Sequence, residues 1–357
     1  MIHAFTPTEL LAAIANGLDD VALSSSAGSP AVVIDLEEPF DRGDLRRVAG
    51  LLATAPVVLI GVSPTGPADE PAADDLDVLL CGGDGFGAQW VGCGVALAET
   101  VQALSTSIAD SPDASVVLAQ LLRVGSTSSA ADAIIAESWV YSLLQGGRRY
   151  ARWLESRSLR TPRPRPQSAV VRLERVGDVL HVILNRPEVR NAFGTRMRDE
   201  LVEAFRLVDI DRTLHSVVVR GAGSSFCSGG DLDEFGTAPS PVEAHRVRTS
   251  RNAGIALVAI ADRVEVLVHG TCVGAGVELP AFASRVVAHS QTTFRLPEIS
   301  MGLVPGAGGT SSIPRRLGRH RATYFALSGE PIDAQLALSW GLVDEIDDSR
   351  FDLEGER

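Results

Sequence analysis

The second half of the sequence alternates strand-like and helix-like segments, and this alternation restricts the chain to an α/β fold. Residues 170–187 contain two β-branched runs around a Val-Gly-Asp turn, and residues 193–211 follow with the apolar spacing of an amphipathic helix. The runs SVVVRGAG (216–223) and VEVLVHGTCV (264–273) indicate two buried strands, each with a glycine-containing loop. Loops at the carboxyl ends of strands are where α/β folds build their sites, so we expect functional residues there.

The first half of the chain has a different organisation. The runs at 31–36 and 57–62 predict two strands on either side of a helix, which is a β-α-β unit. From about Gly94 the apolar residues recur at helical spacing, and further helices are expected at 116–122 and 130–154. A helical segment therefore separates the β-α-β unit from the second half.

The stretch SLRTPRPRPQS (158–168) predicts an extended linker, because its prolines remove backbone donors and fix the chain. We therefore divide the chain into a β-α-β region (1–94), a helical segment (95–157), this linker and an α/β core (169–357). The order of elements in the first region is similar to that at the start of the core. The region is either a degenerate duplicate of the core or simply another β-α-β unit.

The acidic composition narrows the range of partners. A net charge of −13 argues against nucleic acid, which needs a basic surface, and against anionic membranes. No apolar stretch reaches membrane-spanning length without a charge or a helix breaker, and no secretory signal opens the sequence. The four cysteines form no CxxC pair and no cluster has metal-ligand spacing, so we expect a cytoplasmic protein with free thiols and no metal.

Two glutamates stand in the largely apolar stretch from Gly274 to Ser300. Glu278 follows a glycine loop at the expected start of a helix, and Glu298 lies between a proline and a second glycine turn. The first N–H groups of a helix have no internal partner, and the SGGD loop (228–231) also presents bare N–H groups. Two such loops facing each other would form an oxyanion hole, although a glycine-rich turn of this kind, taken alone, is usually structural.

Four segments of the second half, taken together, resemble the crotonase superfamily, that is, the enoyl-CoA hydratase/isomerase family. They are NRPEVRNAF (185–193), GAGSSFCSGGDLDEFG (221–236), HGTCVGAGVELP (269–280) and FRLPEISMGLVPGAGGT (294–310). The resemblance covers about residues 168–346. It implies a crotonase-like core built as a spiral of β-β-α turns, preceded here by an α/β and helical region. If the first region is a duplicate of the core, it is a degenerate crotonase-like half. The resemblance also implies an acyl-CoA substrate with no separate cofactor, and homotrimers or hexamers.

The resemblance implies roles for nine residues of this sequence. The two residues whose backbone N–H groups hold the thioester oxygen correspond to Ser228 and Ala275. The acid/base carboxylates correspond to Glu278 and Glu298. The family's CoA-binding loop corresponds to Arg190, Asn191 and Ala192. The segment beside the bound adenine corresponds to Asp231 and Leu232.

Two residues and one region depart from the family pattern. Ala275 stands where the family usually has glycine, and Pro280 stands where small residues are usual, so the helix should start about Gly276. Family members continue beyond the stretch corresponding to 341–346 with helices that close the acyl pocket and stabilise the trimer. We expect residues 95–154 to supply such helices here, in cis or from a neighbouring subunit.

The retained pair of glutamates favours hydration of a 2-enoyl-CoA, because isomerases of the family typically need only one acid/base position. When water adds at the β-carbon, two N–H donors stabilise the enolate oxygen, one carboxylate activates the water and the other supplies the α-proton. Burial should raise the pKa of at least one carboxyl. The alternatives are an enoyl-CoA isomerase, a CoA-ester hydrolase, or a non-catalytic crotonase-like scaffold subunit.

Overall fold

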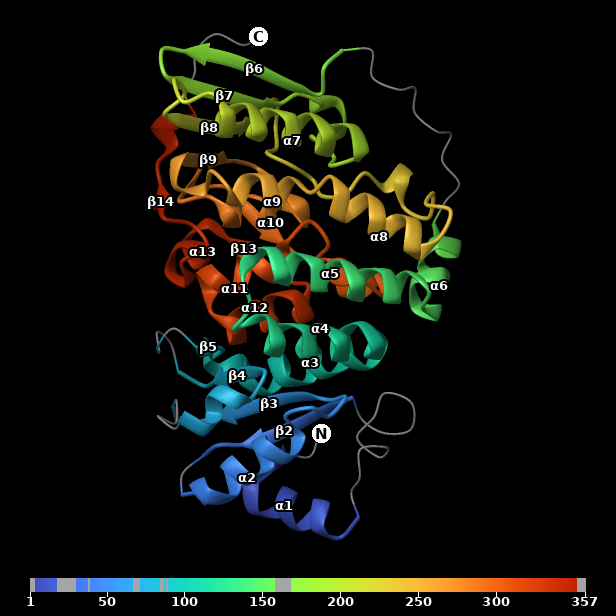
Figure 1. Cartoon of the computed structure of the whole chain (residues 1–357). Coiled ribbons are helices and arrows are strands. Elements are labelled where there is room, and N and C mark those ends of the chain that lie inside the picture. The colour runs from blue at the N-terminus through green and yellow to red at the C-terminus, as the bar shows by residue number, and fades with distance from the viewer. Residues whose placement is uncertain are drawn as a thin grey trace.

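The structure is a computed structural model, which describes residues 4–17, 30–37, 39–66, 71–83, 87, 89–157 and 168–351. Its elements are stacked in layers, from two helices of the first half at one end to an antiparallel hairpin of the second half at the other (Figure 1). Of the predicted Arg/Pro linker, only Ser168 lies within the described residues.

A parallel five-stranded sheet forms the first part of the chain. Its strands lie side by side in sequence order, namely β1 (Ala4–Phe5), β2 (Ala31–Asp35), β3 (Val58–Ser63), β4 (Val78–Cys81) and β5 (Val91–Gly92). Four helices flank this sheet, namely α1 (Pro7–Ala15), α2 (Arg42–Leu52), α3 (Leu97–Asp110) and α4 (Pro112–Gly125). The β2-α2-β3 unit is the one that the sequence predicts, and α2 begins where the Asp41 carboxylate accepts the Asp44 N–H.

Alternate residues of these strands enter two different cores, as the period of two in a strand requires. Val32, Ile34 and Leu59 pack with α1 and α2 in a small core of their own. Val33 and Ile60 belong instead to the main core, which runs through α3 and α4 and continues into the second half. One hydrophobic core therefore joins the two halves of the chain.

The single helix expected over 130–154 is in fact two helices. Helix α5 (Ala130–Gln145) ends at Gly146, and α6 (Arg148–Ser156) begins after Gly147. Two successive glycines break the helix because they cost the most backbone entropy to order. Helix α5 lies between the helices α3 and α4 and the second half of the chain (Figure 1). It packs on helices of the second half.

The second half contains two sheets. The larger has the order β14-β11-β9-β8-β7-β6, with an antiparallel β6–β7 hairpin and otherwise parallel pairs. Its strands are β6 (Val171–Val176), β7 (Val179–Leu184), β8 (Ser216–Gly221), β9 (Val264–Val268), β11 (Arg285–Ala288) and β14 (Glu345–Ile346). The smaller sheet consists of β10 (Thr271–Val273), β12 (Thr293–Arg295) and β13 (Ile332–Asp333).

The run 264–273, expected as one strand, is divided between these two sheets. Strand β9 ends at Val268, the chain turns at Gly270 with a φ of 61°, and β10 then pairs with β12. A Cβ at Gly270 would lie 2.2 Å from the Ser224 carbonyl oxygen, so only glycine fits this turn. The turn directs β10 and the loop after it away from the larger sheet.

The helices of the second half cover these sheets (Figure 1). They are α7 (Thr195–Ile210), α8 (Pro241–Ser250), α9 (Ala253–Val258), α10 (Ala275–Glu278), α11 (Gly309–Leu317), α12 (Arg319–Ser328) and α13 (Ala334–Trp340). Helix α10 begins at Ala275, one residue before the expected start. Within the described part of the chain, no helix is both long and apolar enough to span a membrane.

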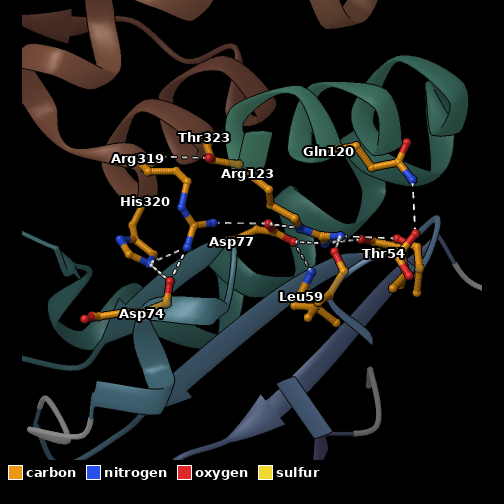
Figure 2. Close-up of polar contacts among 12 residues, drawn as sticks. Thr54, Leu59, Asp74, Asp77, Gln120, Arg123, Arg319, His320 and Thr323 are labelled. Carbon is orange, nitrogen blue, oxygen red and sulfur yellow. Dashed lines mark hydrogen bonds and ion pairs between the residues drawn. The ribbon is translucent and has the colours of Figure 1, made fainter. Parts of the chain in front are cut away.

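A buried polar network fixes the five-stranded sheet against α4 of the first half and α12 of the second (Figure 2). Asp77, just before β4, is fully buried and accepts the Leu59 N–H at 2.8 Å. Its carboxylate also binds Arg123 of α4 at 2.6 Å and Arg319 of α12 at 3.4 Å. Because a buried carboxylate is costly unless it is paired, this contact holds the sheet, α4 and α12 in one relative position.

Candidate active site

Two glycine-containing loops from different strands lie against each other. Val273, the last residue of β10, donates its N–H to the Cys227 carbonyl at 3.0 Å. Gly276 approaches the same carbonyl so closely that a Cβ there would lie 2.3 Å from the oxygen. The loops after β8 and β10 therefore face each other, as an oxyanion hole requires.

The two predicted acid/base glutamates meet at Gly274. This glycine has a φ of 48°, and a Cβ on it would lie 2.5 Å from Glu298 Oε1 and 3.8 Å from Glu278 Oε1. Glycine alone combines this backbone conformation with room for the Glu298 carboxylate. The tertiary structure thus brings both carboxyl groups to one loop.

Glu278 is buried and held by the glycine turn that follows Glu298 in the sequence. Its Oε2 accepts the N–H groups of Ala307 at 2.7 Å and Gly309 at 2.9 Å. Burial raises the pKa of the Glu278 carboxyl to about 7, although these backbone donors favour its charged form. The carboxyl can therefore exchange a proton near neutral pH.

Glu298 begins a short 3-10 helix (Glu298–Met301). Its Oε2 is buried and has no hydrogen-bond partner among the described residues. Burial, followed by the charge of Glu278, raises the pKa of Glu298 well above its usual range. Two neighbouring carboxyl groups therefore differ in environment, since only Glu278 accepts backbone donors from the turn.

A third buried glutamate, Glu137 on α5, holds the same turn from the first half of the chain. Its Oε1 accepts the Gly308 N–H at 2.7 Å, and its Oε2 accepts the Thr310 N–H at 2.9 Å and hydroxyl at 2.7 Å. Burial, followed by the charge of Glu278, raises the pKa of Glu137 to about 8. Glu137 and Glu278 thus bind alternate N–H groups of one turn.

A cavity of about 440 Å³ opens onto the glutamate pair. Gly230 and Ala275 line it beside Glu278 and Glu298, and Tyr141 of α5 forms part of its wall. Other walls come from residues 235–239 and from α8. A cavity of this size, with few convergent polar groups, is typical of a small-molecule site.

One of the two backbone N–H groups that line this cavity does not belong to the residue expected from the sequence. The Ser228 N–H already donates to the Arg190 carbonyl at 2.9 Å, and Ser228 does not line the cavity. The expectation for Ser228 therefore does not fit this geometry. Gly230 and Ala275 do line the cavity, and in the part of the chain described neither N–H has a hydrogen-bond partner.

The loop expected to lie along CoA is held in place by hydrogen bonds of Asn191. Asn191 is fully buried, and its amide binds the Arg186 N–H at 2.8 Å and the carbonyls of Ala222 at 2.8 Å and Ser225 at 2.9 Å. Its neighbours differ in exposure, since the side chain of Arg190 is exposed and Ala192 is buried. Arg190 and Asn191 both have a positive φ, of 52° and 53°, which the Asn191 hydrogen bonds stabilise.

The segment expected beside the adenine is also fixed by contacts within the protein. Asp231 is buried, pairs with Arg186 at 2.9 Å and caps the short turn Leu232–Glu234. The Leu232 carbonyl accepts a hydrogen bond from Arg157 at 2.6 Å. Asp231 lines the cavity, whereas Leu232 does not.

Sequence reasoning missed three residues that the first-half helices and α8 bring to the site. They are Glu137, Tyr141 and Arg248. One signal was present, since Glu137 is the only charged residue in the apolar helical run AIIAESWVYSLLQ (133–145). A carboxylate in such a run needs a buried partner.

Comparison with known proteins assigns the second half to a family. The model described as Enoyl-CoA hydratase/isomerase matches residues 174–356. The 2,3-dehydroadipyl-CoA hydratase of Escherichia coli (strain K12) is 36% identical over 176 residues, which are 49% of this chain and 68% of that protein. The 1,2-epoxyphenylacetyl-CoA isomerase of the same strain is 33% identical over 174 residues, which are 48% of this chain and 66% of that protein.

A solved structure is also similar to about half of this chain. The enoyl-CoA hydratase from Thermoplasma volcanium GSS1 is 34% identical with a TM-score of 0.48, over 52% of this chain and 74% of that one. The chain spans between 62% and 68% of the length of the curated relatives it matches. The family match begins after the helices α3 to α6.

Proposed function

The chain belongs to the enoyl-CoA hydratase/isomerase family, and on that premise we propose that it hydrates a 2-enoyl-CoA thioester in the cavity lined by Glu278 and Glu298. One observation carries the proposal. Both carboxyl groups reach one cavity, beside two backbone N–H groups that are free to bind an oxygen. An enzyme that adds water across a double bond needs two acid/base groups, whereas shifting that bond needs only one.

Glu278 is the general base in this proposal. Two backbone donors bind its Oε2 and favour the carboxylate, which leaves Oε1 to accept a proton from water. The hydroxide part of the water bonds to the β-carbon of the enoyl group. The two electrons of the double bond move to the α-carbon and the thioester oxygen.

Glu298 is the general acid. Burial and the charge of Glu278 raise its pKa, which favours the protonated carboxyl that can deliver a proton to the α-carbon. After delivery Glu298 is ionised and Glu278 protonated. Transfer of one proton from Glu278 to Glu298 restores the starting state.

The Gly230 and Ala275 N–H groups form the oxyanion hole in this proposal, in place of the Ser228 and Ala275 pair. Charge grows on the thioester oxygen during water addition, and preorganised donors lower the barrier most when they point to that oxygen. The loop at Arg190, Asn191 and Ala192, with Asp231 and Leu232, remains our proposed CoA-binding surface.

The helices of the first half complete this site within the same chain, in our proposal. Support comes from Glu137, which holds the turn that positions Glu278, and from Tyr141, which lines the cavity. A shortened chain beginning at Ser168 should therefore be insoluble or inactive. A soluble, active product would refute this role for the helices.

We also propose that the protein assembles as a homotrimer or hexamer. Its proposed compartment is the cytoplasm. Cys81, Cys227 and Cys272 are buried free thiols, and Cys93 is free as well, as in a reducing compartment. Light scattering coupled to size-exclusion chromatography measures the oligomer mass directly.

Absorbance at the enoyl-thioester band tests the hydratase reaction. Crotonyl-CoA and a longer 2-enoyl-CoA should lose this band with the wild type, and both Glu278→Gln and Glu298→Gln should abolish the loss. Loss that persists in one variant, together with conversion of a 3-enoyl-CoA, would favour an isomerase instead. Acyl-CoA binding without turnover of either substrate would contradict the hydratase proposal.

A further inference from the structure

Arg248 brings a positive charge to the wall of the cavity. It lies on α8, is partly buried, and lines the same cavity as Glu278 and Glu298. Burial lowers the pKa of its guanidinium from the ordinary value, which means that the charged form is poorly solvated there. A buried cation is normally paired with an anion.

All hydrogen-bond partners that the protein supplies to Arg248 are neutral, although the Glu137 carboxyl also acts on its charge at longer range. Its guanidinium donates to the Ser138 hydroxyl at 3.1 Å, the Ser138 carbonyl at 3.3 Å, the Gln145 amide oxygen at 3.3 Å and the Ser142 hydroxyl. It also stacks on the Tyr141 ring, 4.5 Å from the centroid. No carboxylate of the described residues forms an ion pair with it.

The other arginines of the cavity wall are different. Arg198 pairs with Asp199 at 2.7 Å, and Arg251 pairs with Glu203 at 2.9 Å. Three acidic side chains of the wall have side-chain partners, namely Asp231 with Arg186, Glu234 with Thr195, and Glu243 with Arg246. Glu278 accepts backbone N–H groups, whereas Glu298 Oε2 has no hydrogen-bond partner among the described residues. Among the described residues, Arg248 is therefore the arginine of the cavity wall that forms no ion pair.

Tyr141 contacts both Arg248 and the glycine turn beside Glu278. One face of the ring carries the guanidinium, while a ring carbon lies 2.4 Å from where a Cβ on Gly306 would be. The next residue, Ala307, donates its N–H to Glu278. Tyr141 thus packs against both Arg248 and the turn that holds the proposed base.

We propose that Arg248 binds a carboxylate on the far end of the acyl chain, so that the preferred substrates are CoA monothioesters of unsaturated dicarboxylic acids. This inference rests on the proposed function for the position of the thioester. An acyl carboxylate at Arg248 supplies the missing counter-ion and forms charge-assisted hydrogen bonds with the guanidinium. A plain hydrocarbon chain would leave the cation unpaired and desolvate it further.

The test compares two substrates of equal chain length, trans-2-hexenedioyl-CoA and trans-2-hexenoyl-CoA. Wild-type kcat/KM should be at least about tenfold higher for the dicarboxylic substrate, which is the size expected of a charged hydrogen-bonded pair. Arg248→Met should reduce this preference by at least about tenfold, mainly through KM of the dicarboxylic substrate. Arg152→Met, at an exposed arginine of α6 that does not line the cavity, is the matched control and should leave the preference unchanged.

Two further measurements keep the inference open to refutation. If Arg248→Met does not fold, Arg248→Gln retains hydrogen bonding to α5 without the charge and should show the same loss of preference. If the wild type hydrates neither substrate, the hydratase proposal fails, and calorimetric binding of hexanedioyl-CoA against hexanoyl-CoA still tests Arg248. Equal or weaker binding of the dicarboxylic ligand by the wild type would refute the inference and leave Arg248 as a link between α5 and α8.

Discussion

Replacing Glu137 with alanine should weaken both folding and catalysis, although Glu137 lies on a helix outside the family match. The change removes three hydrogen bonds, to the Gly308 N–H, the Thr310 N–H and the Thr310 hydroxyl. Each orphaned buried donor costs about 1–3 kcal/mol, so three of them cost at least about 3 kcal/mol. We expect a loss of about 3–5 kcal/mol in the free energy of unfolding.

Catalysis should suffer because the same turn holds Glu278. If the turn shifts by about 1 Å, the proposed base is misplaced and kcat should fall by about 10- to 100-fold. Glu137→Gln retains the volume and one acceptor, so it should lose less stability and less activity than Glu137→Ala. These variants should act on turnover more than on KM, since Glu137 holds the turn that binds Glu278 and does not line the cavity.

Urea unfolding followed by circular dichroism gives the stability, and hydration of a 2-enoyl-CoA gives the activity. Glu155→Ala, an exposed glutamate on α6, is the matched control and should leave both unchanged. Wild-type stability in Glu137→Ala would refute the reasoning that this carboxylate holds the turn. A large loss of stability with unchanged kcat would show that the contact is structural and does not position Glu278.

Three other predictions follow from buried charges and a strained glycine. Asp77→Ala should lower the free energy of unfolding by about 3–5 kcal/mol, measured in urea, because two arginines lose their buried partner; an effect below about 1 kcal/mol would contradict this. Gly274→Ala should abolish turnover while the protein stays folded, because the new methyl group displaces the Glu298 carboxylate; a normal kcat would refute the geometry. The raised pKa of Glu278, about 7 when folded against 4.5 when unfolded, contributes stability that is complete below pH 4.5 and is lost as pH rises through 7. Urea titrations should therefore show wild-type stability falling over this range, by up to about 3 kcal/mol more than in Glu278→Gln, and equal slopes would refute the shift.

The sequence by itself was sufficient for several local elements and for singling out the two glutamates that the fold brings to one cavity. The hairpin of β6 and β7, helix α7 and strand β8 follow from apolar periodicity and turn residues within short windows. The glycine loops around Glu278 and Glu298 were identified from residue types at fixed spacing. Such features depend on neighbours in the chain, so the sequence records them directly.

Other features depended on where the chain turns in space. The run 264–273 looks like one strand, and only the packing of Gly270 against the Ser224 carbonyl divides it between two sheets. Ser228 and Gly230 are two residues apart in one loop, and which N–H is free depends on whether the Arg190 carbonyl lies within reach. Local pattern contains no information on that distance.

The tertiary structure alone decided which residues complete the site. Glu137 and Gly308 are separated by 171 positions, and Ser138 and Arg248 by 110, yet each pair is hydrogen-bonded. Nothing near Glu137 or Arg248 in the sequence specifies these partners. They are brought together because one hydrophobic core joins the two halves of the chain, and burial then forces each polar group to find a partner within it.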